Sequence, residues 1–354
     1  MSSSPPDFAP LHFLAVVVAI PVGLYLVWFF AIAFHEGGHA VGAILVGYRI
    51  QSIHIGPIVW RRTYLGFRAG PAGGLLVSSS GAVTARPCGR RRHLRLRTAV
   101  FVAAGPLASF ATAIACFGLS VVATGGDEKW FSLFGVTNVV AGMMAAIPSE
   151  KSALGRPTDG AQLLSLFRRR SRVLLTWEIA LMYSRAIETL PPDAEAASLD
   201  DLAERTKRFE PVPGTVSTGV LALALDAGRF DLAKPMLAAA LETKRPVAGS
   251  VGTYLRNAAV VAALEEQKPD ALRAFLQISR ATAKSPQELV VLEAVLHASL
   301  GNEDEARSAL KEWPQFLASV RDSRTLEFDM RWIVRMLEAR LAAAEPRVAR
   351  IAGG

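Results

Sequence analysis

The sequence predicts a mostly α-helical membrane protein, with a bilayer-embedded first part and a soluble helical second part. Long apolar runs are confined to the region before about residue 150, whereas charged residues concentrate after it. The overall hydrophobic content of 51% therefore averages over two unlike regions. We expect a membrane-embedded domain over residues 1–172, a connecting helix and linker over 173–215, and a soluble helical domain over 216–345.

Three apolar segments are long enough to cross a bilayer. They occupy residues 11–34, 98–124 and 130–148, and about 20 helical residues span a hydrocarbon core of roughly 30 Å. The helical pattern of the first segment continues to Val46. A short polar turn separates the second and third segments, which favours a helical hairpin. The sequence therefore predicts about three transmembrane helices.

Arginine placement sets the expected orientation. Arginines crowd the loop between the first two segments and the stretch after the third, so three crossings put both stretches on one side. The positive-inside rule makes that side cytoplasmic and leaves the N-terminus outside. No organelle-targeting segment is recognisable, which favours a bacterial plasma (inner) membrane. Because these flanking arginines account for the net charge of +8, we expect a lipid bilayer as partner and no nucleic acid.

The loop over residues 48–97 has the pattern of short strands and turns. Isoleucines that include Ile53 and Ile55 alternate with polar residues, and glycines punctuate the run. Two interpretations remain open. The loop could display arginines to lipid headgroups, or it could hold an unwound substrate segment by edge pairing.

The end of the first apolar segment carries a His-Glu-x-x-His motif. His35 and His39 are four residues apart, so both imidazoles lie on one face of a helix and can reach the same Zn²⁺. Glu36 is then placed to act as general base on a water activated by the metal. Ionisable side chains at membrane depth are costly, which argues against a purely structural role for all three. Two histidines do not complete a catalytic zinc site, which has three protein ligands and an open position.

Three motifs in a fixed order resemble a known family. The His-Glu-Gly-Gly-His helix is followed by Ala-Gly-Pro-Leu-Ala-Ser-Phe at 104–110 and by Pro-Thr-Asp-Gly-Ala at 157–161. Together they resemble the site-2 protease family of intramembrane zinc metalloproteases. The resemblance covers about residues 11–168 and implies that Asp159 is the third zinc ligand, while Gly105 and Pro106 receive no catalytic role.

Two features depart from the family pattern. The family places an Asn three residues before a Pro that precedes the Asp-Gly pair; here Pro148 is present, but the Asn position is Ala145. This departure bears on substrate positioning more than on metal binding. Glu150 is the rival third ligand, and Asp159 could also be the N-cap of a helix over 161–167.

The second part of the chain reads as consecutive helices. An amphipathic helix is expected over 173–187, a break at 190–193, and a series of helices from Val216 to about Leu341. Three similar stretches, at 225–233, 264–271 and 300–306, each read as a helix end, a polar turn and a new helix. Their spacing is near that of tetratricopeptide repeats, and an ordinary helical bundle is the alternative. We expect this domain to contact a protein partner, a substrate or a second copy of the chain.

The sequence as a whole predicts a zinc metalloendopeptidase that cleaves a transmembrane or membrane-adjacent segment near the cytoplasmic face. Two other classes remain as alternatives. One is a membrane-anchored adaptor with a vestigial metal site, supported by Ala145. The other is a transporter component that uses His35, Glu36 and His39 as a relay, although three crossings are few for that role.

Overall fold

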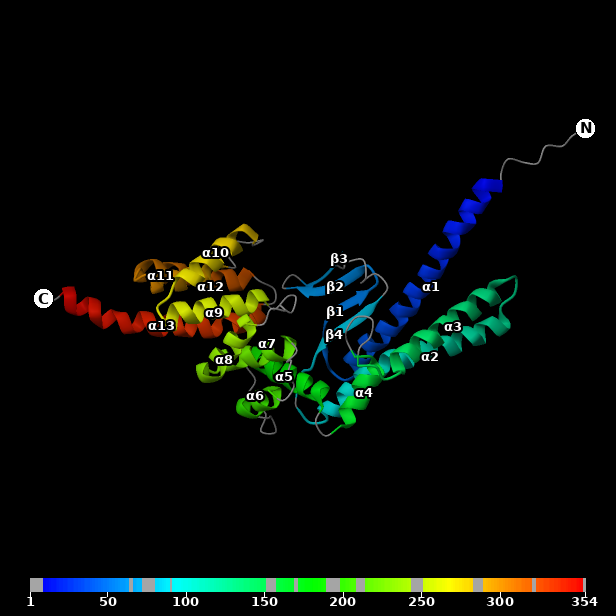
Figure 1. Ribbon diagram of the computed structural model, residues 1–354, viewed down its shortest axis with the longest axis horizontal. Helices are drawn as coiled ribbons and strands as arrows, with labels where there is room; N and C mark the ends of the chain where they lie inside the picture. Colours follow the sequence, from blue (N-terminus) through cyan, green and yellow to red (C-terminus); the bar gives the residue numbers. More distant parts are fainter. Residues whose placement is uncertain are drawn as a thin grey trace, which may run out of the picture. The chain divides into compact units, whose positions relative to one another are not determined.

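The computed structural model describes residues 9–63, 66–71, 80–89, 91–150, 157–168, 171–188, 198–207, 214–242, 251–282, 289–319 and 323–352. The chain is mostly helical and divides into two compact units (Figure 1). The first comprises residues 1–62, 67–88 and 93–174, and the second comprises the remainder, chiefly residues 175–354.

Three long helices form the body of the first unit: α1 (Ala9–Leu45), α2 (Leu94–Val122) and α3 (Asp127–Ala146). They lie side by side, with α2 and α3 as a hairpin, as predicted (Figure 1). Within the described residues, Val17–Leu45 and Leu94–Val122 are long and apolar enough to cross a membrane. The α3 helix forms where the third crossing was predicted, but its polar first turn and Asn138 lower its hydropathy.

A glycine turn and an arginine fix the C-terminal end of α1. Gly47 adopts a left-handed φ of 71°, and the Tyr48 N–H donates to the Ala43 carbonyl over 2.7 Å, as in a Schellman helix end. The Arg97 side chain donates to the Val46 carbonyl and lies over the Tyr48 ring. These contacts join the end of α1 to the start of α2, so the depth of one helix against the other is fixed.

A small antiparallel sheet occupies most of the loop between α1 and α2. Its strands are β1 (Arg49–Ile55), β2 (Ile58–Thr63), β3 (Gly66–Pro71) and β4 (Gly81–Arg86), in the spatial order β3-β2-β1-β4. The predicted strands are therefore confirmed. Ile53 and Ile55 lie on β1 in the interior of the sheet, so the outer strands of the described sheet are β3 and β4. Both β1 and β4 pack against α1.

The second unit is built from short helices. They are α5 (Arg172–Ile187, whose first turn belongs to the first unit), α6 (Leu199–Lys207), α7 (Gly214–Asp226), α8 (Phe230–Glu242), α9 (Val251–Glu265), α10 (Asp270–Thr282), α11 (Val290–Ser299), α12 (Glu303–Ser319) and α13 (Ser323–Ala352). The amphipathic helix predicted over 173–187 is confirmed as α5. The break predicted at 190–193 lies outside the described residues.

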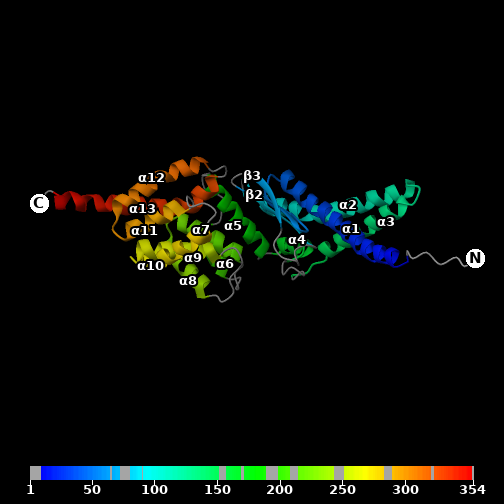
Figure 2. The same cartoon turned by 90° about the horizontal axis from the view of Figure 1, so that it is seen from above.

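The three similar stretches are turns between paired helices, as predicted. They join α7 to α8, α9 to α10 and α11 to α12, and the members of each pair pack together. The long α13 packs against α7, α9 and α11 (Figures 1 and 2). These helices share one hydrophobic core, whose fully buried side chains include Leu276, Leu292 and Ile333. Assignment of these pairs to the tetratricopeptide repeats stays a prediction.

Candidate metal centre

The final turns of α1 carry three buried ionisable side chains. His35, Glu36 and His39 are only 9%, 5% and 7% exposed. The helix places the two imidazoles one turn apart on the same face, as the motif predicted, with ring centroids 4.9 Å apart. Glu36 projects from α1 toward β4.

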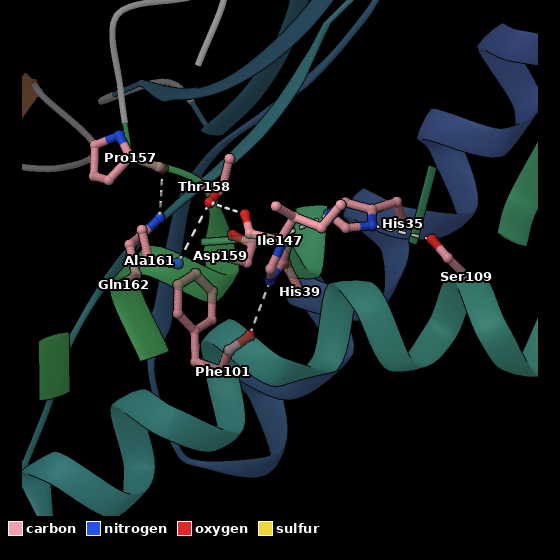
Figure 3. A network of polar contacts seen from close by, with 10 residues as sticks. All are labelled: His35, His39, Phe101, Ser109, Ile147, Pro157, Thr158, Asp159, Ala161 and Gln162. Atoms are coloured by element: carbon pink, nitrogen blue, oxygen red, sulfur yellow. Dashed lines mark hydrogen bonds and ion pairs between the residues drawn. The ribbon is translucent and has the colours of Figure 1, made fainter. Parts of the chain in front are cut away.

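Asp159, the first residue of α4 (Asp159–Phe167), completes a cluster with the two histidines (Figure 3). Its Oδ2 atom lies 3.1 Å from His35 Nε2 and 3.2 Å from His39 Nε2. The ligand-type atoms of the three residues all lie within 4.8 Å of one another. Residues 120 positions apart in the chain thus converge on one point, as the resemblance implied.

Two contacts from α2 orient the imidazole rings. His35 Nδ1 lies 3.0 Å from the Ser109 hydroxyl, and His39 Nδ1 donates to the Phe101 carbonyl over 2.9 Å. Because that carbonyl can only accept, the Nδ1 atom of His39 carries the proton and a neutral ring presents a lone pair at Nε2. That lone pair faces a carboxylate oxygen. The contact is favourable only with a proton or a metal cation between the two atoms.

The segment before α4 holds Asp159 in place. Thr158 is the N-cap: its hydroxyl accepts from the Ala161 N–H and donates to the Ile147 carbonyl over 2.8 Å. The Thr158 N–H donates to the Ser149 carbonyl over 2.9 Å. The expectation that Asp159 is itself the N-cap is therefore wrong by one residue. Because Thr158 satisfies the helix end, the Asp159 carboxylate is free to face the histidines.

Burial and hydrogen bonding act in opposite directions on the Asp159 carboxyl. Its burial would raise its pKa, but the hydrogen bonds from His35 and His39 outweigh this and lower the pKa to about 2. Asp159 is therefore ionised at neutral pH, which is the form that binds a metal.

Glu150, the rival third ligand, lies outside the cluster. Its side chain is 87% exposed and is 3.9 Å from Arg168. Ala145 is in the last turn of α3 and is half-buried. The described geometry therefore favours Asp159 over Glu150.

Missing side chains at three glycines make the close approaches of the site possible. A Cβ at Gly38 would overlap the Ala104 carbonyl oxygen, so α1 and α2 are in backbone contact there. A Cβ at Gly105 would overlap the His39 ring at Nε2, and one at Gly160 would overlap the Ala146 carbonyl oxygen. Gly105 was predicted to have no catalytic role, and its role in the structure is steric: the missing side chain leaves room for the His39 ring.

A sequence model described as Peptidase family M50 matches residues 23–318. The chain belongs to this family. The resemblance to the site-2 proteases is thereby confirmed, and with it the assignment to membrane metallopeptidases that act in intramembrane proteolysis. No curated protein and no solved structure matches the sequence.

Sequence reasoning about this M50 peptidase missed the residues that orient the cluster. Ser109 and Gly105 lie in the motif at 104–110, four residues apart, so each faces α1 from the same side of α2. That spacing could have indicated a supporting role for both. No sequence signal could have indicated the Phe101 carbonyl, because a backbone contact of this kind leaves no trace in residue type.

Substitution of Gly105 tests the steric requirement at His39. We expect Gly105→Ala to lower the metal content of the purified protein at least about tenfold, because the new methyl group displaces the His39 Nε2 atom from the cluster. Gly118→Ala is the matched control, since Gly118 lies on the same helix and a Cβ there meets no atom within 4 Å. Elemental analysis measures both. Equal metal content in the two variants would contradict the expectation.

Proposed function

We propose that this M50 peptidase is a zinc-dependent endopeptidase that cleaves a transmembrane or membrane-adjacent segment of another protein. One observation carries the proposal: two histidine nitrogens and one carboxylate oxygen converge on a single point beside a buried glutamate. In this reading His35, His39 and Asp159 are the zinc ligands, and Glu36 is the general base.

The donor set fits zinc. Two imidazole nitrogens and one carboxylate oxygen are a common catalytic zinc set, and donor atoms of a tetrahedral site with bonds near 2.0–2.1 Å lie about 3.3 Å apart. The separations of 3.1 and 3.2 Å between the histidine nitrogens and the carboxylate oxygen agree with this spacing. The contacts to Ser109 and Phe101 occupy the other ring nitrogens, as metal-binding histidines require. A bound cation would also compensate the negative charges buried here.

The metal ligands, the general base and the residues that orient the imidazoles have separate roles in the proposed hydrolysis. Zinc bound by the three ligands would supply Lewis acidity, which lowers the pKa of water toward about 7 and polarises a carbonyl group. The Glu36 carboxylate accepts the proton of the attacking water and passes it to the leaving amine. Ser109 and the Phe101 carbonyl hold the imidazoles in position.

We extend the proposal to the membrane topology. The α3 helix has 20 residues, which is about 30 Å of helix, and its charged residues are confined to its first turn. With α3 as a third crossing, the N-terminus is outside, and the arginine-rich sheet region and the second unit are cytoplasmic. The cluster near the C-terminal end of α1 then lies toward the cytoplasmic face of the inner membrane of a bacterium.

The substrate segment must be extended at the cleaved bond. A helix keeps its carbonyls in internal hydrogen bonds, so a transmembrane substrate has to unwind to present one. The β4 strand is an edge of the sheet and runs beside Glu36. We therefore propose that the unwound segment adds to the sheet along β4. Under this proposal the sheet binds substrate, in contrast to the alternative in which it only displays arginines to lipid headgroups.

Backbone methylation of a cleaved peptide tests strand addition. In an added strand, every second N–H points at β4, so N-methylation should slow cleavage at alternate residues and have little effect at the residues between. Rates of cleavage for a series of singly N-methylated peptides measure this. A series with no two-residue period would rule out pairing with the sheet.

The second unit is proposed to bind a protein: a partner, a substrate region or a second copy of the chain. Its described residues contain no metal-type cluster, and its paired helices form a continuous core. We expect that deletion of residues 190–354 lowers cleavage of the natural substrate without removing zinc. Unchanged cleavage by the truncated chain would contradict this role.

The metal and the base are tested together. We expect about one zinc per detergent-purified chain, lost in His39→Ala and Asp159→Ala and retained in Glu150→Ala and Glu36→Gln. We expect Glu36→Gln to lower hydrolysis about 10²-fold or more, because the general base is removed. Elemental analysis and peptide hydrolysis measure these quantities. An adaptor with a vestigial site would instead keep its cellular function in Glu36→Gln, and zinc retained in Asp159→Ala would refute the third ligand.

A further inference from the structure

The β4 strand packs against α1 and is an outer strand of the sheet, with a defined set of outward backbone groups. The Gly56 N–H donates to the Ser80 carbonyl over 2.9 Å, and Ile55 pairs with Gly81 while Ile53 pairs with Val83. Hydrogen-bonded and non-hydrogen-bonded pairs alternate in an antiparallel ladder. Since Ser80 bonds to β1, the N–H and C=O groups of Gly81 and Val83 point away from β1, to the free edge of the sheet.

Glu36 lies against β4 at Gly81. A Cβ built on Gly81 would lie 2.5 Å from Glu36 Cγ and 2.7 Å from Glu36 Cδ, and would overlap Oε1. Real Cβ atoms do not approach neighbours this closely. The φ angle of Gly81 is outside the left-handed region, so the backbone itself accepts alanine. The glycine at this position therefore has a steric explanation, the Glu36 side chain.

Among its described neighbours, Glu36 makes its close polar contact with β4. The backbone of Val83 lies within hydrogen-bonding reach of the carboxylate, and Oε2 has no hydrogen-bond partner among the described residues. One carboxylate oxygen thus lies against the strand while the other is buried and unpaired. A general base needs this arrangement: one oxygen fixed and the other available to the water it deprotonates.

We propose that Gly81 is a positioning residue for Glu36: the missing side chain lets the catalytic carboxylate lie against β4, beside the metal ligands. The proposal rests on the proposed function for its catalytic consequence. The steric contact itself is independent of that function. The three atoms nearest to a Cβ at Gly81 all belong to Glu36, so substitution of Gly81 should separate catalysis from metal binding.

A thermodynamic cycle tests the contact without any assay of activity. We expect Gly81→Ala to lower the Tm of the detergent-purified full chain by at least about 2 °C, because the new methyl group overpacks against Glu36. In a Glu36→Ala background the same substitution should leave Tm unchanged, because the colliding atoms are gone. Gly70→Ala is the matched control: Gly70 lies on β3 of the same sheet, and a Cβ there meets no atom within 4 Å. Equal Tm losses in both backgrounds would overturn the contact.

Activity and metal content test the catalytic consequence. With fluorescein-labelled β-casein as the probe, we expect Gly81→Ala to retain about one zinc per chain and to lower kcat about 10²-fold, while Gly70→Ala matches the wild type. Gly81→Ala should cause no further loss in a Glu36→Gln background. A multiplicative loss in that background, or loss of zinc, would overturn positioning through Glu36.

The two failures are distinguishable. A wild-type chain that binds zinc and shows the Tm coupling but hydrolyses no probe would overturn the proposed function together with the catalytic part of this proposal. An active wild-type chain without the Tm coupling would overturn the role of Gly81 alone.

Discussion

The close packing of α1 against α2 is the constraint on which the site depends. Gly38 of α1 meets the backbone of Ala104, and Gly105 of α2 meets the ring of His39. At this separation the Ser109 hydroxyl and the Phe101 carbonyl reach the two imidazoles. A wider spacing would leave the rings unsupported and their nitrogens free to turn. In a bilayer, where lipid is as apolar as a side chain, such contacts between small residues are what hold helices together.

The cluster also has an electrostatic requirement. Two histidines and a glutamate are buried beside a partly buried aspartate, and groups of this kind are tolerated at membrane depth only when they compensate one another. His39 donates its Nδ1 proton to a carbonyl, so its Nε2 lone pair faces the Asp159 carboxylate. The contact between His39 Nε2 and Asp159 Oδ2 is stable only with a positive charge between the two atoms. A proton on Nε2 or a bound metal cation supplies that charge, and the metal is what the proposed function requires.

Much of this protein could be predicted from local sequence pattern. Helix lengths, the strands of the 48–97 loop and the shared face of His35 and His39 all follow from periodicity and composition, and the structure contains them. Asp159 required the resemblance, because no local pattern relates a residue to a partner 120 positions away.

The sequence predictions were wrong or incomplete where contacts between distant residues determine the structure. Thr158 takes the N-cap that was considered for Asp159, because its hydroxyl can bond to both Ala161 and Ile147. The loop over residues 48–97 was expected to offer a pairing edge, but only the strand order assigns the outer positions to β3 and β4. The steric demands at Gly81 and Gly105 depend on what lies opposite each residue, which a single sequence does not contain. A repeat identity for the helical unit stays undecided, since most of the larger tetratricopeptide consensus residues are missing from the sequence.

The glycines have an evolutionary consequence. Three of them, Gly81, Gly105 and Gly160, lie on β4, α2 and α4, and each makes room for the site. A single base change converts a glycine codon to alanine, so chemistry could be lost in this family while the histidine–glutamate signature stays intact. Inactive descendants would then look like enzymes to any search for that signature. Under the proposals made above, a working peptidase needs glycine at these three positions in addition to the histidine–glutamate signature.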